Sequence, residues 1–450
     1  MNKIKNLSEG NFLKLLFAFL SVCFLAAAFC MPDRASAFSG LWNIMSQPNK
    51  ISANYFAMGG YAATFLNMGL VGLSALLLFV VFKGTPNNAS TLAVILTIGF
   101  GSWGINVLNI WPSILGVCLY CLVKKEKFGA NVNAMLFSTG IAPLITDLMI
   151  RYPHAEAVGF NVTGILLALF VGAIIGFFLP AGLAHSPKVH KGFDLYSAAL
   201  PIGMTAFFLN ATLFKTMGVA LPKALSDIDA ATMQVASPVI ANTFCGILFG
   251  LCIVFAFALG CKPRDYWRLL TDPNLVTNFS STYGNATFLM NVGVFGLFIL
   301  GYYNLIGAPF NGVTFGIVFC MLATCNSGSH PGNVWPIMAG YLVTSAVCGL
   351  ISPLVGGNFT FAINAQAICV GLCYANGLSP IADKYGWRYG MVAAVMHYLL
   401  VTSVPALHGG FCLYNGGFTA ALICLILVPE LERFFRTKDE RKAARLQKAK

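Results

Sequence analysis

The sequence predicts an all-α polytopic membrane protein made of two inverted-topology repeats. Of its 450 residues, 58% are hydrophobic and 9% are charged, whereas about a quarter of the residues of a soluble domain carry charge. The motif Asn-x-Trp-Pro occurs at Asn109 and again 224 residues later at Asn333. Lys and Arg residues concentrate in alternate short loops between apolar runs, which is typical of a multi-pass protein.

The net charge of +12 does not indicate nucleic-acid binding, because the basic residues flank apolar spans and act as orientation signals. We therefore expect the lipid bilayer, and no nucleic acid, among the partners. The fourteen Cys residues are scattered through apolar segments. The one C-x-x-C pair, Cys118 and Cys121, has no second pair or neighbouring His to complete a metal site. We expect neither a metal nor a cofactor.

The first repeat, residues 1–225, contains apolar runs in an order that the second repeat reproduces. The run 12–30 is long enough to span a bilayer, and the Ala35-Ser36-Ala37 sequence after it makes a cleaved signal peptide the alternative. Retention is favoured because the run 237–260 has the same place in the second repeat. The further runs are 58–82, the interrupted stretch 91–123, 130–150, 160–184 and a last span after His190.

The second repeat, residues 226–432, carries matching motifs in the same order. Its later spans are 284–303, the interrupted stretch 314–344, 361–382, 389–407 and one after His408. Each repeat has seven apolar segments if an interrupted stretch counts as two, and a re-entrant hairpin is the other interpretation. Residues 433–450 form a basic cytosolic tail, with contact to anionic lipid heads as the alternative. The matched pairs include Trp42 and Trp267, Ala63-Thr64-Phe65 and Ala286-Thr287-Phe288, Phe128 and Phe361, Gly140 and Gly377, and His190 and His408.

The odd number of segments predicts that the second repeat starts from the opposite face of the membrane. With the N-terminus inside, most Lys and Arg residues fall in inside loops, whereas the outside loops 304–310, 352–358 and 408–410 hold none. We expect a multi-pass protein of the cell membrane with both termini in the cytoplasm. The inside set is Lys83, Lys124, Lys125, Lys127, Lys188, Lys191, Lys262, Arg264, Arg268, Lys384 and Arg388, and the exceptions are Arg34, Lys50, Arg151, Lys215 and Lys223.

The two interrupted stretches are the predicted solute site. A polar break in an apolar span frees backbone groups, which are tolerated at membrane depth only where protein or a wet cavity satisfies them. Amides, hydroxyls and half-helix ends suit a small polar solute or a small anion. The alternatives are that Asn and Ser pin helix crossings and that Trp residues form an interfacial belt. The predicted substrate-binding residues are Asn67, Thr91, Ser102, Asn109, Trp111, Asn291, Thr314, Asn326, Asn333 and Trp335.

Ionisable residues within the spans are few, and each is a candidate proton carrier because charge is costly inside a bilayer. His397 lies in mid-span and is the proton-coupling candidate, with a buried hydrogen-bonded His as the alternative. Asp147 lies near the exit of its span, where a snorkelling or capping acid is the alternative. Asp194 begins a span, where the alternative is an acid favoured by the helix dipole. We therefore expect flux that depends little on a proton gradient.

The sequence favours a transporter or channel over an enzyme. It contains neither a G-x-x-x-x-G-K-[ST] motif nor an H-E-x-x-H motif. Its polar residues are paired between the repeats, whereas an enzyme usually needs an asymmetric catalytic set. A membrane-embedded enzyme acting on a lipid-linked substrate is the alternative, and a non-transporting scaffold is the third interpretation. A homo-oligomer is compatible with all three.

Three motifs carry a resemblance to a known family: Gly40-Leu41-Trp42 with Ser46-x-Pro48, Ala63-x-Phe65-x-Asn67-x-Gly69, and the Asn-Ile-Trp-Pro that begins at Asn109. With them the chain resembles a bacterial integral-membrane family catalogued only as a domain of unknown function. The resemblance implies a fold and a bacterial inner-membrane location but no activity. The repeat layout is also similar to that of urea transporters, whose two inverted halves enclose a pore, although their more distinctive motifs are not evident here.

Overall fold

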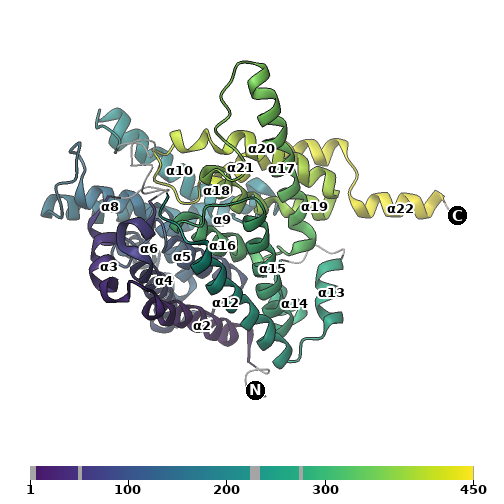
Figure 1. The fold of residues 1–450 in the computed structure, drawn as a ribbon, viewed down its shortest axis with the longest axis horizontal. Helices are drawn as coiled ribbons and strands as arrows, with labels where there is room; N and C mark the ends of the chain where they lie inside the picture. The colour runs from purple at the N-terminus through teal and green to yellow at the C-terminus, as the bar shows by residue number, and fades with distance from the viewer. Residues whose placement is uncertain (1–6, 49–52, 223–233, 273–276, 449–450) are drawn as a thin grey trace.

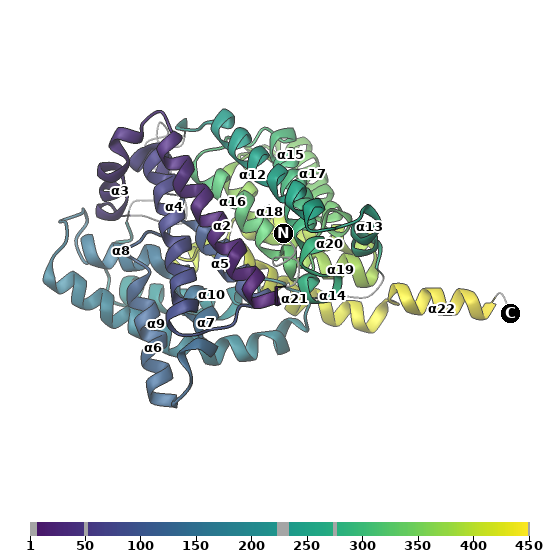
Figure 2. The ribbon, with the colours of Figure 1, turned by 90° about the horizontal axis from the view of Figure 1, so that it is seen from below.

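The fold is described by a computed structural model covering residues 7–48, 53–222, 234–272 and 277–448. These residues form helices joined by turns, with one isolated β-bridge between Ala236 and Asn311. Seven helices in this part of the chain are long and apolar enough to cross a membrane. The first repeat and the second form two lobes that lie side by side, and the last helix projects away from both (Figures 1 and 2).

The first repeat opens with a long helix, Glu9–Cys30, that packs against the next long helix of the same repeat, Tyr55–Val81. Phe24 lies 5.8 Å from Phe65, ring centre to ring centre, so the run predicted to be retained has a structural role. The elements are α2 (Glu9–Cys30), η1 (Arg34–Ser36), α3 (Ala37–Ser46), α4 (Tyr55–Val81), α5 (Asn88–Phe100), α6 (Trp111–Lys124), η2 (Phe128–Ala130), α7 (Val132–Ser138), η3 (Thr139–Ile141), α8 (Ala142–Ile150), α9 (Val162–His190), α10 (Ala199–Asn210) and a π-helical turn, η4 (Ala211–Thr216).

The second repeat follows the same order and ends in a separate charged helix. The elements are α12 (Pro238–Ala258), α13 (Pro263–Thr271), α14 (Phe279–Tyr283), α15 (Asn285–Leu305), α16 (Gly312–Leu322), η6 (Ala323–Asn326), α17 (Pro331–Leu354), α18 (Gln366–Ala375), η7 (Asn376–Leu378), α19 (Ser379–Tyr385), α20 (Trp387–Val401), η8 (Val404–Ala406), α21 (Asn415–Phe434) and α22 (Lys438–Lys448).

The two repeats share a backbone break that the sequence comparison did not use. Gly60 has φ 88° inside α4, and Gly284, 224 residues later, has φ 86° just before α15. A side chain is strained at such a positive φ, which is why glycine occupies both positions. In the first repeat the Asp33 carboxylate accepts a hydrogen bond from the Ala62 backbone N–H and restarts the helix after the break. The two repeats therefore share the positive-φ glycine at this break, whereas the Asp33 contact is described for the first repeat.

The helices α5 and α16 are counterparts, and they lie side by side in opposite directions. Thr91, near the start of α5, is hydrogen-bonded to Asn326, beyond the end of α16. Near the end of α5, a Cβ on Gly99 would lie only 2.8 Å from the carbonyl oxygen of Gly316, near the start of α16. Counterpart helices that run antiparallel are related by an axis perpendicular to them, so the repeats are inverted, as predicted.

The ends of the repeats exchange equivalent hydrogen bonds. The Leu195 N–H donates to the Gly377 carbonyl at 3.0 Å, and the Leu413 N–H donates to the Gly140 carbonyl at 2.9 Å. The acceptors are in or beside the short 3₁₀ turns η3 and η7, which interrupt equivalent helices. Each repeat thus donates a backbone hydrogen bond to the interrupted helix of the other repeat, and these bonds join the two repeats.

Several predicted boundaries differ from the structure. At 1.5 Å per residue, the 13 residues of α5 and the 11 of α16 reach only about 20 and 16 Å, so neither crosses a hydrocarbon core of about 30 Å alone. The helix α21 continues to Phe434, past the predicted start of the tail at residue 433. The predicted join at residue 225 falls in 223–233, outside the described residues.

Candidate functional site

The polar breaks after α5 and α16 are the candidate site, and we call residues 101–110 break 1 and residues 323–330 break 2. Break 1 lies beside the start of α16, because the Ser102 carbonyl would be 2.7 Å from a Cβ on Gly312. Break 2 lies beside the start of α5, through the hydrogen bond from Asn326 to Thr91. The two breaks therefore lie at opposite ends of the antiparallel pair.

Asn67 and Asn291 hold the two breaks in equivalent ways. The Asn67 amide donates to the carbonyls of Gly101 (2.7 Å) and Ile105 (2.8 Å), and its oxygen accepts from the Val107 N–H (3.2 Å). The Asn291 amide donates to the carbonyls of Cys325 and Ser329, and its oxygen accepts from the Tyr266 hydroxyl. Both side chains are fully buried, and these bonds replace those that the breaks have lost.

Asn109 and Asn333 close the same breaks from the other side. The Asn109 oxygen accepts from the Asn106 N–H, and its amide donates to the Gly104 carbonyl and to the Thr146 hydroxyl. The Asn333 oxygen accepts from the His330 N–H, and its amide donates to the Gly328 carbonyl and the Asp383 carboxylate. Each Asn is thus bound within its own repeat. The hydrogen bonds of the described residues do not join Asn109 to Asn333, or Asn67 to Asn291.

Among the other predicted site residues, Thr91 and Asn326 are the pair joined between repeats, at 3.2 Å. The Asn326 oxygen also accepts from the Ser280 N–H. Ser102 and Thr314 are buried, and their hydroxyls donate to backbone carbonyls one turn earlier. These contacts match the alternative in which Asn, Ser and Thr pin helix crossings.

Trp111 and Trp335 lie at the surface of the molecule. Their exposed fractions are 36% and 43%, and Trp335 packs against Trp387 with 6.1 Å between ring centres. The Trp111 indole N–H donates to the Val107 carbonyl. Both side chains therefore lie outside the buried part of the breaks, which fits the interfacial-belt alternative and not the predicted role of lining a site.

Two buried hydrogen-bond donors in break 1 have no partner among the described residues. They are the indole N–H of Trp103 and the side-chain amide of Asn106, which are 1% and 0% exposed. The Trp103 ring lies against α16, since a Cβ on Gly316 would be 2.7 Å from its Cδ1 atom. The Asn106 oxygen accepts from the N–H groups of Leu108 and Asn109. That bonding fixes the amide, and the side chain of the buried Tyr55 is the polar neighbour of its N–H groups.

The sequence comparison missed these donors because they are not repeated. At the same offset of 224 residues, Ser327 stands opposite Trp103 and His330 opposite Asn106. In break 2 the His330 Nδ1 accepts a hydrogen bond from the Gly332 N–H. Ser329 lies 3.5 Å from Ser379, oxygen to oxygen. A search for polar positions in the breaks that differ between the repeats would have found Trp103 and Asn106.

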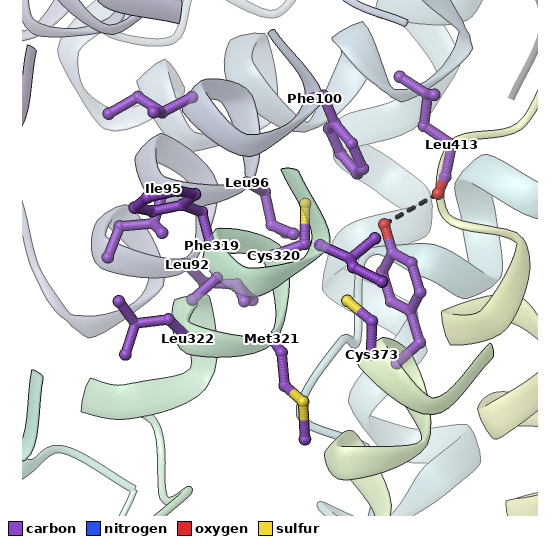
Figure 3. Packing of buried hydrophobic residues seen from close by; sticks show 14 of the residues in the cluster. Leu92, Ile95, Leu96, Phe100, Phe319, Cys320, Met321, Leu322, Cys373 and Leu413 are labelled. Carbon is purple, nitrogen blue, oxygen red and sulfur yellow. Dashed lines mark hydrogen bonds between the residues drawn. The ribbon is translucent and has the colours of Figure 1, made fainter. Parts of the chain in front are cut away.

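The space between the two breaks is filled by apolar side chains. Leu92, Leu96 and Phe100 from α5 meet Phe319 and its neighbours from α16, all at most 5% exposed (Figure 3). At one edge the Tyr374 hydroxyl donates to the Leu413 carbonyl at 2.8 Å, the dashed line of Figure 3. The breaks are therefore separated by close packing in this conformation. The other labelled members are Ile95, Cys320, Met321, Leu322 and Cys373.

The ionisable residues predicted inside the spans have defined partners. The His397 Nε2 donates to the Gly416 carbonyl at 2.8 Å, so its Nδ1 accepts from the Tyr341 hydroxyl at 2.6 Å. This is the buried, hydrogen-bonded His of the alternative interpretation. Asp147 is 0% exposed, and both its carboxylate oxygens accept hydrogen bonds from the Arg151 guanidinium. Arg151 is 2% exposed, so its charge is neutralised by Asp147 inside the molecule.

Two hollows of the described surface differ in character. One, of about 780 Å³, is lined by Lys83, Lys127, Asn87 and Asn133 where the loop before α5 meets η2. The other is an apolar groove of about 490 Å³ between α2 and α12, the first helices of the two repeats. Among the described residues, no group of three His, Cys, Asp or Glu side chains is placed to hold a metal ion.

Comparison with known proteins identifies the family. Residues 33–216 and 263–433 match the family model described as Protein of unknown function (DUF1576). The chain belongs to the DUF1576 family. The two matched segments of this DUF1576 protein fall one in each repeat, and with the apolar helices they establish a polytopic all-α membrane protein. No curated protein and no solved structure matches the chain, so the likeness to urea transporters stays a prediction.

Proposed function

We propose that this DUF1576 protein is a transporter or channel for a small polar solute, bound at the interface of the two repeats. The observation that carries the proposal is the pair of unpartnered donors in break 1, the Trp103 indole N–H and the Asn106 amide. The protein lies in the cell membrane with both termini in the cytoplasm, as the distribution of Lys and Arg favours.

The energetic cost of these donors supports a binding role. A buried donor without a partner destabilises a fold by about 1–3 kcal/mol, and such groups in native proteins are often explained by a missing ligand or water. Trp103 and Asn106 are three residues apart in one break, and the fully buried Tyr55 adjoins the Asn106 side chain. A solute that accepts hydrogen bonds, such as a neutral carbonyl compound or a small monovalent anion, would satisfy both donors.

The packing between the breaks supports a pathway that is closed in this conformation. Break 1 and break 2 lie at opposite ends of α5 and α16, with apolar side chains between them (Figure 3). The two helices approach most closely where Gly99 meets Gly316, and small residues at a crossing let backbones lie close together. Opening requires α5 to move relative to α16, which would let each break exchange solute with its own side.

The apolar groove between α2 and α12 bears on the alternative of an enzyme with a lipid-linked substrate. The groove is lined by aliphatic and aromatic side chains, with Cys23, Cys30 and Thr243 as its most polar members. None of its lining residues is an acid, a base or a His, so the groove offers no group for proton transfer. The groove is better suited to contact a lipid acyl chain than to catalyse a reaction.

The test is solute permeation into proteoliposomes containing the full chain, followed by light scattering after an osmotic step. Urea, acetamide and formate are suitable probes because each accepts hydrogen bonds. Trp103→Phe removes one donor together with part of the buried ring. Asn106→Asp replaces the other donor with an acceptor and changes the side-chain shape little. Trp387→Phe, at a 49% exposed Trp, is the matched control. We expect faster permeation of at least one probe than in protein-free vesicles and about a tenfold loss in each break variant. Wild-type rates in both break variants would refute the site.

A further inference from the structure

The turns before the last helix of each repeat have the same hydrogen-bonded frame around a His. The His190 Nδ1 accepts from the backbone N–H of Asp194, and its Nε2 donates to the Ser197 hydroxyl. The His408 Nδ1 accepts from the backbone N–H of Cys412, and its Nε2 donates to the Asn415 oxygen. Both rings are thus neutral with the proton on Nε2. The two turns make equivalent hydrogen bonds around the His. A residue that differs between them can therefore be compared in the same local structure.

The position four residues after each His differs in chemistry: it is Asp194 in the first repeat and Cys412 in the second. Asp194 lies in the connecting segment 191–198, outside the helices, because α10 begins only at Ala199. The sequence-based prediction that Asp194 begins a helix is therefore wrong. Its side chain is 2% exposed; one oxygen accepts from the Tyr196 N–H, and the other has no partner among the described residues.

Within the described ranges, no cation forms an ion pair with this carboxyl. The ion pairs of the described residues are Asp147 with Arg151 and Lys191 with Glu432, so the nearest Lys in sequence is bound elsewhere. Lys384 lies over the Phe193 ring, 4.9 Å from its centre. The groups that face Asp194 are the neutral His190 and Tyr196 of its own turn, the Cys424 thiol of α21, and Gly377 of η7.

An ionised carboxylate is costly in such a place, and a neutral carboxyl is not. Burial raises the pKa of the Asp194 carboxyl to about 7. The turn also contacts the centre of the molecule, since the Tyr196 hydroxyl lies between the carbonyl oxygens of Cys320 (2.9 Å) and Cys373 (3.1 Å), which share its one hydrogen. The Leu195 N–H donates to Gly377 in η7. A change of charge at Asp194 therefore acts directly on the junction of the two repeats.

We propose that Asp194 is a proton-binding site, protonated in this conformation, and that its ionisation displaces the 191–198 turn from η7. An O–H bond forms at the unpartnered oxygen with a proton from water and breaks by returning it to water. Coupling of this step to solute movement rests on the proposed transport function. It departs from the gradient-independent flux expected from the sequence. That expectation rested on the small number of ionisable residues within the spans and treated Asp194 as an acid at a helix start.

The first measurement is infrared difference spectroscopy of the reconstituted protein over about two pH units either side of the raised pKa. We expect a protonated-carboxyl band that is lost as the pH rises, and that is absent in Asp194→Asn and in Asp194→Cys, which copies the second repeat. Asp439→Asn, in the exposed tail helix α22, is the control and should keep the band. A spectrum unchanged by both Asp194 variants would overturn the proposal.

A second measurement does not depend on transport either. A carboxyl whose pKa is raised by folding binds its proton more tightly in the folded state. The folded state therefore loses stability as the pH rises from about 3.9, the unfolded value, to about 7. We expect the thermal midpoint of the wild type to fall over this window and that of Asp194→Asn to fall less. Equal slopes in the two proteins would contradict a titrating Asp194.

Uptake driven by an imposed pH gradient then tests coupling. We expect accumulation in the wild type, and only downhill exchange in Asp194→Asn. If the infrared band behaves as expected but no probe solute crosses the membrane, the proton site stands and the transport function fails. If accumulation persists in both Asp194 variants, the coupling role is wrong.

Discussion

Replacing Asn67 separates a framework role from a solute-binding role. The change Asn67→Leu keeps the branched shape of the side chain but removes three hydrogen bonds, to the Gly101 and Ile105 carbonyls and from the Val107 N–H. All three partners are backbone groups of break 1, which begins where the helix α5 ends at Phe100. We therefore expect Asn67→Leu to reduce stability rather than specific flux.

The size of the loss follows from the number of bonds. Interhelical hydrogen bonds in membrane proteins average about 0.6 kcal/mol each, so three give roughly 2 kcal/mol. A buried backbone group left without a partner costs about 1–3 kcal/mol, which raises the total toward roughly 5 kcal/mol. Since Val107 is only half-buried, water can serve its N–H. We expect a loss of about 2–5 kcal/mol, a large part of the 5–15 kcal/mol typical of a folded protein.

The assay is unfolding in detergent micelles, combined with permeation per folded molecule. Asn291→Leu should show a similar loss, because Asn291 binds two carbonyls of break 2 in the same way. Asn131→Leu is the control, since the Asn131 amide is bound at the surface to Glu126. Asn67→Asp should be worse than Leu at neutral pH, because a carboxylate would face two carbonyl oxygens. Wild-type stability with loss of flux in Asn67→Leu would refute the framework role.

Two further predictions concern orientation and His397. In a Cys-depleted background, a Cys at position 356 should react with an impermeant reagent added to intact cells, whereas a Cys at position 125 should not. The reason is that the loop with Lys125 is basic and residues 352–358 include no Lys or Arg. The reverse labelling pattern would overturn the topology. His397→Gln should leave the response of uptake to a pH gradient unchanged. It should reduce the free energy of unfolding by about 1–2 kcal/mol, because both ring nitrogens are hydrogen-bonded, to Tyr341 and Gly416. If this variant alone abolished gradient-driven accumulation, His397 would be the coupling residue.

The sequence alone determined the repeats and their relative orientation. The Asn-x-Trp-Pro motifs at Asn109 and Asn333 and the matched His190 and His408 mark equivalent places in the chain, and the structure gives them equivalent hydrogen bonds. Hydropathy fixes which segments enter the bilayer because unpaired backbone groups are excluded from it. An odd number of segments then forces inversion. These properties depend on composition and order along the chain, so they can be read without coordinates.

Only the tertiary structure decided which polar residues are available to a solute. Positions repeated in both halves, such as Asn67 and Asn291, are repeated because both breaks need the same internal hydrogen bonds. Trp103 and Asn106 occur in one break only, and their unused donors become apparent only when every possible partner is placed. The same holds for Asp194, whose isolation depends on Lys191 and Lys384 making contacts elsewhere. Whether a polar group is satisfied is a property of its neighbours in space, and the order of residues does not specify them.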